Sequence, residues 1–340
     1  MPLEPRQLHP HPQLTVVWSQ PPMLKRTAAE RWLARHVRAL VLGALAAFAY
    51  ACTVAIGGAL LAENLLRPPR RDVTANDAAR ARAVARRTGS QLSEQALHAA
   101  DGAVLKGWWF VPPGRNRGTV IVMHGHTDNR TAMLGLAELL VADHYRVLAP
   151  DARAHGSSGG ALATYGVLER ADLRMWADWA QRQAPDECLF GAGSSMGGAI
   201  LIETLPDVPF CAAITDSAFA DLSALGTWRI GTQLHLPASL HGIVATPFVA
   251  AADWYTQVWH GIALQSASPV SRLAQGRVPL LVIHGTGDHH VPPSHARMLA
   301  EANPRFVTLW LVPGAVHTQA WAAAPRAYPA RLLAFLAAHQ

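Results

Sequence analysis

The chain has 340 residues, of which half are apolar and only 15% are charged. This composition excludes a wholly disordered chain and predicts a sizeable buried core. The formal net charge is +6, but the basic residues concentrate before residue 90, where there are few aromatic side chains and no nucleic-acid-reading motif. We therefore interpret the positive charge as the flanks of a membrane anchor and expect no nucleic-acid partner.

Residues 1–38 are rich in proline and histidine at first and then become basic. Residues 39–62 follow with 24 positions free of charge. As a helix rising 1.5 Å per residue, this stretch would span roughly 36 Å, enough for a hydrocarbon core of about 30 Å. A signal peptide usually has a shorter apolar region nearer the start, and a soluble core helix is seldom apolar on every face. We predict a retained single-pass transmembrane helix.

The orientation of this helix depends on its basic flanks, which nearly balance under the positive-inside rule. The basic residues before and after it are Lys25, Arg26, Arg31, Arg35 and Arg38, and Arg67, Arg70, Arg71, Arg80 and Arg82. We expect a cytoplasmic N terminus, with the large domain on the extracytoplasmic side of the membrane.

The rest of the chain divides into a linker and one large domain. Residues 63–95 are interpreted as a linker or juxtamembrane helix. From 96 to 340, short apolar strands alternate with helical segments, which is typical of a mostly parallel, doubly wound sheet covered on both faces. Residues 221–266 interrupt this alternation, and we predict a helical cap over the carboxyl ends of the strands, where such folds bind ligands.

The three cysteines are Cys52, Cys188 and Cys211. They form neither a C-x-x-C motif nor a metal-ligand spacing. An odd and sparse set predicts no disulfide framework and does not decide the redox compartment.

The stretch ECLFGAGSSMGGAIL, Glu187–Leu201, fits two kinds of site at first sight. A dinucleotide-binding loop requires G-x-G-x-x-G, but Met196 stands where the third glycine is needed. The alternative is G-x-S-x-G from Gly193 to Gly197, a tight strand-to-helix turn that holds a nucleophilic serine above the sheet. Ser195 is the centre of that pattern, and Ser194 is its variable position.

A serine nucleophile needs a base and an orienting acid, which in this architecture follow it in the order acid, then histidine. Asp288 follows the predicted strand of VPLLVIHGTGD, and His317 follows the next strand, FVTLWLVPGAVH. Asp216, at the end of the strand in FCAAITD, is a rival for the acid and stays open as an alternative.

Residues 96–340 resemble the α/β-hydrolase superfamily, in particular membrane-anchored serine hydrolases that are similar to prolyl-oligopeptidase-type catalytic domains. The motifs that carry the resemblance are VIVMHGHTDNR, LAPDARAHGSSGG, GAGSSMGGA, LLVIHGTGDHHVPPSHARMLA and GAVH. It implies Ser195 as nucleophile, His317 as general base and then acid, and Asp288 as the orienting carboxylate. It also implies an oxyanion hole from the backbone N–H groups of Met196 and His126, although a histidine at position 126 departs from the small or polar residues common there.

Two histidine-containing clusters suggest a metal site as an alternative. One contains His124, His126 and Asp128, and the other is the run from Asp288 to His290. Neither provides a complete ligand set, and we expect neither a metal nor a cofactor.

The sequence therefore predicts a membrane-anchored serine hydrolase that cleaves an ester, thioester or amide through an acyl-enzyme. The apolar cap and the anchor favour a small-molecule or lipid-like, amphiphilic ester as substrate. The alternatives are a serine peptidase of the prolyl-oligopeptidase type and a non-catalytic anchored binding domain.

Overall fold

The computed structural model describes residues 27–340. The chain divides into two compact units, residues 1–51 and 52–340. Residues 1–26 of the expected N-terminal segment lie outside the described residues, and the rest of that segment is helical from Ala28. The helix is α1 (Ala28–Leu66), whose last fifteen residues belong to the second unit.

Helix α1 contains the predicted transmembrane stretch. Within the described part of the chain, it alone is long and apolar enough to cross a membrane as a single helix. The pair formed by α6 (Leu222–Gln233) and α7 (Ala238–His260), bent by 115°, passes the same test when taken as one span. An apolar helix near the N terminus has the properties of a membrane span and also those of a signal sequence.

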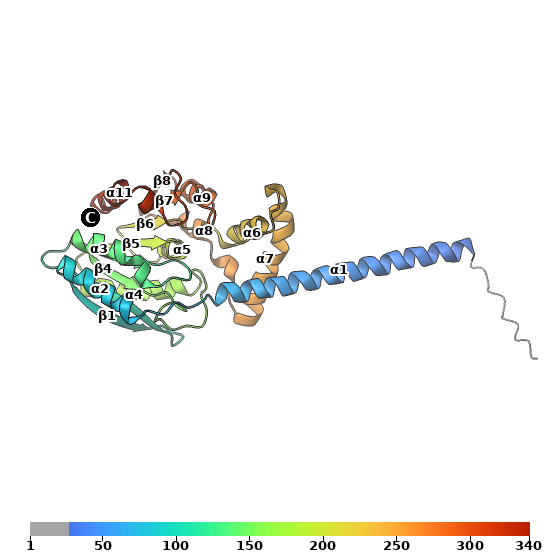
Figure 1. Cartoon of the computed structure of the whole chain (residues 1–340), viewed down its shortest axis with the longest axis horizontal. Coiled ribbons are helices and arrows are strands. Elements are labelled where there is room, and N and C mark those ends of the chain that lie inside the picture. Colours follow the sequence, from blue (N-terminus) through green and yellow to red (C-terminus); the bar gives the residue numbers. More distant parts are fainter. Residues whose placement is uncertain (1–26) are drawn as a thin grey trace, which may run out of the picture. The chain divides into compact units, whose positions relative to one another are not determined.

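Within residues 27–340, eight strands form one sheet in the order β1-β2-β4-β3-β5-β6-β7-β8. Only β2 runs against its neighbours, and β4, β3 and β5 to β8 are parallel. Strands β1, β4 and β5 to β8 of this sheet are labelled in Figure 1. The strands are β1 (Gln91–His98), β2 (Val104–Val111), β3 (Thr119–Met123), β4 (Arg146–Pro150), β5 (Leu189–Ser194), β6 (Ala212–Asp216), β7 (Leu280–Gly285) and β8 (Val307–Val312).

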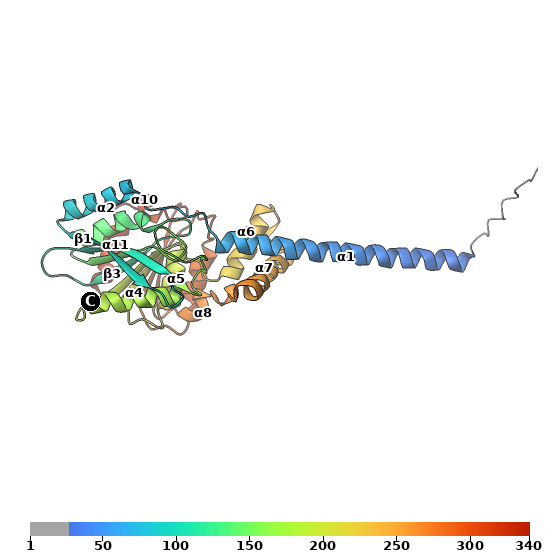
Figure 2. The same ribbon diagram turned by 90° about the horizontal axis from the view of Figure 1, so that it is seen from below.

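Helices cover both faces of this sheet (Figure 2). The remaining helices are α2 (Ala75–Thr88), α3 (Leu134–Ala142), α4 (Glu169–Gln183), α5 (Met196–Thr204), α8 (Pro269–Leu273), α9 (Ser294–Ala302), α10 (Ala320–Ala323) and α11 (Ala327–Ala337), with short 3₁₀ turns at Arg130–Met133 and Leu264–Ser266. Helices α4, α5, α8 and α9 contribute to one apolar cluster, and α2, α3, α10 and α11 contribute to the other.

Alternating side chains of the central strands fill these two clusters. In β3, Ile121 and Met123 pack in one cluster, whereas Val120 and Val122 pack in the other. Side chains on a strand point alternately to opposite faces, so a strand buried on both sides is apolar throughout. This arrangement confirms the predicted doubly wound architecture with a helical insertion.

The region expected to be a linker or a juxtamembrane helix contains the helix α2. Helix α2 begins at a capping box, in which Thr74 and Asp77 each bond the backbone N–H of the other, and such caps stabilise a helix start. Ala81 and Val84 of α2 are buried in the core. Strand β1 begins at Gln91, five positions before the expected domain start, and pairs with β2 through a turn that contains Asp101 and Gly102.

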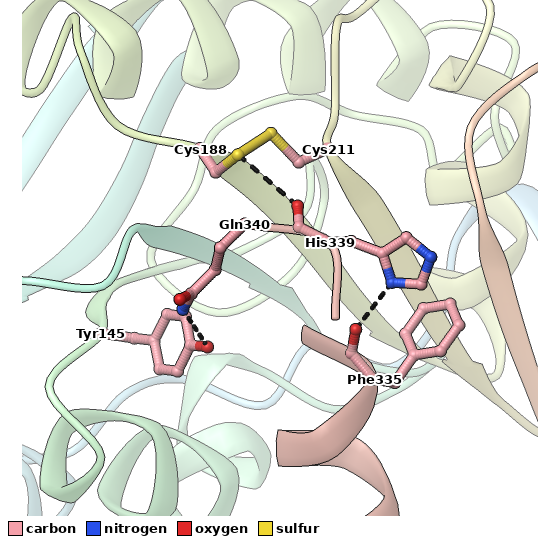
Figure 3. Close-up of a disulfide and its surroundings, with 6 residues drawn as sticks. All are labelled: Tyr145, Cys188, Cys211, Phe335, His339 and Gln340. Carbon is pink, nitrogen blue, oxygen red and sulfur yellow. Dashed lines mark hydrogen bonds between the residues drawn. A yellow bond between two sulfur atoms is a disulfide. The ribbon is translucent and has the colours of Figure 1, made fainter. Parts of the chain in front are cut away.

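Cys188 and Cys211 form a disulfide, with a Cα–Cα distance of 5.7 Å (Figure 3). The expectation of no disulfide framework is therefore wrong for this pair, and Cys52 stays free. The pair lies where neighbouring strands β5 and β6 begin, so strand pairing rather than sequence spacing brings the sulfurs together. The C terminus covers this bond: the His339 carbonyl oxygen lies 3.6 Å from Cys188 Sγ, and the Gln340 amide donates to the Tyr145 hydroxyl.

Candidate active site

Strand β5 ends in a turn that holds Ser195 in a strained backbone conformation. Its φ is +50° and its ψ is −116°, outside the regions that L-residues usually adopt. The Ser195 N–H donates to the Asp216 carbonyl oxygen at 2.8 Å, which ties the turn to β6. Helix α5 begins with the next residue, Met196, so its first free N–H groups lie beside the serine.

Two glycines let this turn close. A Cβ on Gly193 would overlap the Gly197 carbonyl group, and a Cβ on Gly197 would overlap the Met123 carbonyl oxygen of β3. Glycine is needed here for close backbone approach. The G-x-S-x-G spacing of the sequence therefore has a direct steric reason.

The structure brings three predicted site residues together from three different strand ends. His317 Nε2 lies 2.9 Å from Ser195 Oγ, and His317 Nδ1 lies 2.7 Å from Asp288 Oδ2. Asp288 is 2% exposed, and its Oδ1 accepts from the backbone N–H groups of His290 and Val291, each at 2.9 Å. The chain of hydrogen bonds runs from a buried carboxylate through an imidazole to a hydroxyl.

The charge state of Asp288 fixes the tautomer of His317. Burial raises the pKa of Asp288, but the hydrogen bonds from His317 and from the Val291 and His290 backbone outweigh it and hold the pKa below its ordinary value. An ionised carboxylate only accepts hydrogen bonds, so His317 Nδ1 carries the proton and donates. His317 Nε2 is then an acceptor for the Ser195 hydroxyl proton.

The loop after β3 passes close to the nucleophile turn. A Cβ on Gly125 would lie 3.5 Å from the Ser195 Cβ and 3.6 Å from the Ser194 carbonyl oxygen. His126 Nδ1 lies 3.3 Å from the Tyr165 hydroxyl, which itself donates to the Leu65 carbonyl oxygen at 3.2 Å. Burial, with smaller effects of His155 and Arg229, lowers the pKa of His126 to about 4, so its ring is neutral at pH 7.

Each of the two alternative metal clusters has one candidate ligand, His124 or Asp288, whose donor atoms are already hydrogen-bonded within the protein. His124 Nε2 accepts from the Ala152 N–H at 3.0 Å, and its Nδ1 donates to the Gly125 carbonyl oxygen at 2.8 Å. Both carboxylate oxygens of Asp288 accept hydrogen bonds as described above. Across residues 27–340, no group of three or more His, Cys, Asp or Glu side chains is arranged to hold a metal ion.

Asp216, the rival acid, lies at the end of β6 with its side chain almost fully buried. Its Oδ1 accepts from the Ser217 hydroxyl at 3.2 Å, and Ser217 Oγ in turn accepts from the Thr318 N–H at 3.1 Å. A cavity of about 150 Å³ next to it is also lined by Ser194 and Tyr328. Asp216 is therefore linked to the His317 loop through backbone and hydroxyl groups, while Asp288 contacts the imidazole directly.

Three further residues lie next to the site, and two of them, Tyr165 and Ser217, belong to no sequence motif. Tyr165 contacts the ring of His126, Ser217 holds the residue after His317, and the exposed ring of His290 lies 5.3 Å from that of His317. His290 stands two positions after Asp288, in the run considered above as a metal site, and that position was the available signal. Tyr165 and Ser217 lie in loops without a motif, so only the folded chain identifies them.

A family model described as "Serine aminopeptidase, S33" matches residues 114–224. This segment includes the loop after β3 and the turn at Ser195, and it ends before Asp288 and His317.

The chain is also similar to individual proteins over most of the described domain. It is 28% identical to human monoglyceride lipase over 246 residues, which cover 64% of this chain and 81% of the lipase. The esterase Pf2001 of Pyrococcus furiosus superposes with a TM-score of 0.62 and 26% identity, covering 80% of this chain and 99% of that chain. The α/β hydrolase GrgF of Penicillium sp. sh18 has the same fold, with a TM-score of 0.56 and 16% identity over 73% of this chain and 99% of that one.

Proposed function

We propose that this chain is a serine hydrolase whose nucleophile is Ser195. The chain belongs to the α/β-hydrolase superfamily and is a hydrolase. The observation that carries the proposal is the continuous hydrogen-bonded set of Ser195, His317 and Asp288. Its members come from three strand ends, and its chain order is that of the superfamily.

In the proposed reaction, Ser195 Oγ attacks the carbonyl carbon of the substrate while His317 Nε2 takes the hydroxyl proton. Asp288 stabilises the resulting imidazolium through the Nδ1–H hydrogen bond. The tetrahedral intermediate collapses when His317 returns the proton to the leaving group, which leaves an acyl-Ser195 ester. A water molecule, deprotonated by His317, then attacks the carbonyl carbon of this ester, and His317 returns the proton to Ser195 Oγ as the acid leaves.

The oxyanion of the intermediate is proposed to accept from the N–H groups of Met196 and His126. Met196 is the first residue of α5, where the helix dipole favours negative charge. The closeness of the Gly125 backbone to Ser195 supports the next residue, His126, as the second donor. Donors of this kind are typically worth about 3–4 kcal/mol of the barrier.

Labelling with a fluorophosphonate probe tests the nucleophile. We expect the wild type to be labelled and Ser195→Ala to be unlabelled. Ser194→Ala is the matched control, because it removes the adjacent hydroxyl and leaves the proposed nucleophile in place, and we expect it to label as the wild type does. Equal labelling of Ser195→Ala and wild type would show that the nucleophile is wrongly assigned. An unlabelled but folded wild type would favour the non-catalytic binding domain.

The proposed substrate is a carboxylic ester with an apolar or amphiphilic acyl group. Similarity to a monoglyceride lipase and to an esterase supports this class, as does the cap of α6 and α7. The peptidase alternative is favoured by the family description of a serine aminopeptidase. Turnover of matched p-nitrophenyl esters and p-nitroanilides of one acyl group separates the two, and we expect the ester to be hydrolysed at least 100-fold faster. Faster cleavage of an aminoacyl anilide would favour the peptidase.

We also propose that α1 is a retained membrane span and that the hydrolase unit lies on the extracytoplasmic side. The Cys188–Cys211 disulfide supports this side, because disulfides persist in oxidising compartments. Treating denatured protein from intact cells with a maleimide-polyethylene glycol tests it. We expect one modification, at Cys52, before reduction and three after it. Three modifications before reduction would place the domain in a reducing compartment.

A further inference from the structure

The cap helix α7 has an exposed apolar face. Successive residues of a helix are rotated by about 100°, so Leu240, Ile243, Ala250, Trp254 and Val258 lie on one side of it. All five are exposed, Ile243 to 73% and Trp254 to 65%. We call these five residues the cap face. Contiguous exposed apolar surface of this kind usually marks an interaction site.

The charges of the helix lie away from the cap face. Helix α7 contains no lysine or arginine, and its single acid is Asp253. Asp253 points toward the following loop, where its Oδ1 accepts from the Gln265 N–H at 2.8 Å. The cap face therefore carries no charge, and its one hydrogen-bonding group is the indole N–H of Trp254.

Next to the cap face, α7 crosses the C-terminal part of α1 (Figures 1 and 2). Gly58 of α1 is buried directly against Ala251 and Ala252, and Gly57 lies against the ring of Phe248. Small residues allow this close helix crossing. Ile56 and Leu60 on the same turns of α1 are exposed, at 62% and 67%. Exposed apolar side chains are therefore present on both helices near the crossing.

A polar cluster closes the crossing at the end of the apolar stretch. Glu63 Oε1 accepts from the Tyr255 hydroxyl at 2.9 Å and lies 2.7 Å from His260 Nε2, and Glu63 Oε2 accepts from Arg67 Nε at 2.7 Å. These contacts fasten the cap to α1 at a fixed level along the helix.

We propose that the cap face docks on the lipid bilayer beside α1, so that the cap lies in the membrane interface. This inference rests on the proposed role of α1 as a membrane span. The apolar stretch ends at residue 62, and α7 crosses four residues earlier, at Gly58. At 1.5 Å per residue, the crossing lies roughly 6 Å inside the apolar boundary. Interfacial helices bury their apolar faces to a depth of about 5–10 Å.

The chemistry of the cap face matches lipid better than a protein partner. Trp254 is an amphipathic aromatic residue of the type enriched at membrane interfaces, and Ile243 and Val258 are aliphatic. A protein partner that covered the cap face would also have to fit against Ile56 and Leu60, which belong to the helix proposed to cross the bilayer. Lipid covers both surfaces without a break.

Depth-dependent fluorescence quenching in the full-length protein tests the docking. Single cysteines are introduced in a Cys52→Ser background that keeps the native disulfide, at Ile243→Cys, Trp254→Cys, Leu60→Cys and Glu301→Cys. Each is labelled with an environment-sensitive nitrobenzoxadiazole probe and reconstituted in phosphatidylcholine nanodiscs with or without doxyl-labelled lipid. Leu60 reports the α1 span, and Glu301, which is exposed on α9, is the control for a surface away from lipid.

We expect doxyl lipid to quench the probes at 243 and 254 at least half as strongly as the probe at 60, and several-fold more strongly than the probe at 301. Quenching at 60 without quenching at 243 and 254 would overturn the docking and leave the membrane span intact. Absence of quenching at all four positions would overturn the span itself. Emission at 243 and 254 could also be blue-shifted, unaffected by doxyl lipid and dependent on the number of protein molecules per nanodisc. That result would assign the cap face to a second copy of the chain.

Discussion

Asp216 and Asp288 occupy equivalent places, at or just beyond the ends of the adjacent strands β6 and β7, and both are almost fully buried. Their environments nevertheless move their pKa values in opposite directions. Burial dominates at Asp216 and, against the hydroxyls of Ser217 and Tyr328, raises its pKa to about 6. At Asp288 the opposing hydrogen bonds win, and the pKa falls below its ordinary value.

The difference comes from the donors that surround each carboxylate. Asp288 accepts from two backbone N–H groups and from an imidazole, whereas Asp216 has hydroxyl neighbours and a small cavity. Hydrogen bonds to a charged carboxylate stabilise it and lower its pKa. Burial with too few hydrogen bonds destabilises the charged form and raises the pKa. Pairs of carboxyl groups whose pKa values are separated in this way often have different tasks. We infer that Asp288 orients the base and that Asp216 positions the loop that carries it.

The largest expected effect is that of Asp288→Asn on turnover. An amide that donates to His317 Nδ1 would force the imidazole proton onto Nε2. A protonated Nε2 can no longer accept the hydroxyl proton of Ser195. We expect kcat for a soluble ester to fall by about 10³- to 10⁴-fold. In the parallel variant Asp216→Asn, we expect kcat to change by less than about tenfold, because no contact to the imidazole is lost. If Asp216→Asn causes the larger loss in a folded protein, Asp216 is the acid.

The second expected effect concerns stability and pH. The ordinary pKa of an aspartate, 3.8, is lower than the value of about 6 for Asp216 in the folded protein. The folded state therefore holds this proton more tightly, and the resulting stabilisation is complete below pH 3.8 and is lost as the pH rises through 6. The pKa difference corresponds to about 3 kcal/mol.

Thermal unfolding in detergent between pH 4 and pH 7 measures this effect. We expect the midpoint of the wild type to fall relative to that of Asp216→Asn across this range, because the variant cannot ionise there. Other titrating groups act equally in both proteins and cancel in the difference. Parallel pH profiles of the two proteins would contradict the raised pKa of Asp216.

The smallest expected effect is that of Ser217→Ala, which removes the hydroxyl between Asp216 and the Thr318 N–H. One neutral hydrogen bond is worth about 1 kcal/mol, so we expect kcat to fall a few-fold as the His317 loop loses its support. KM should stay unchanged, because Ser217 is not proposed to touch the substrate. A rise in KM with unchanged kcat would instead assign Ser217 to substrate binding. Ser194→Ala, on the neighbouring strand end, is the matched control.

Much of this protein was determined by local sequence. The apolar runs predicted buried parallel strands, because a strand covered on both faces has no polar side. The G-x-S-x-G spacing singled out Ser195, because only glycine tolerates the backbone approach at positions 193 and 197. The order of Asp288 and His317 after successive strands placed them at one edge of the sheet, because parallel strands end on the same side.

Other features depend on contacts between segments that are distant in the sequence, and only the tertiary structure decided them. Cys188 and Cys211 are joined because β5 and β6 are neighbours, which their spacing does not reveal. The different roles of Asp288 and Asp216 could be assigned only from the positions of the N–H donors around each carboxylate. The Tyr165 hydroxyl contacts both His126 and the Leu65 carbonyl oxygen at the end of α1, and Leu65 is 100 residues away from it in the chain. Such contacts depend on how complete elements pack, and packing is a property of the folded chain rather than of any short stretch of its sequence.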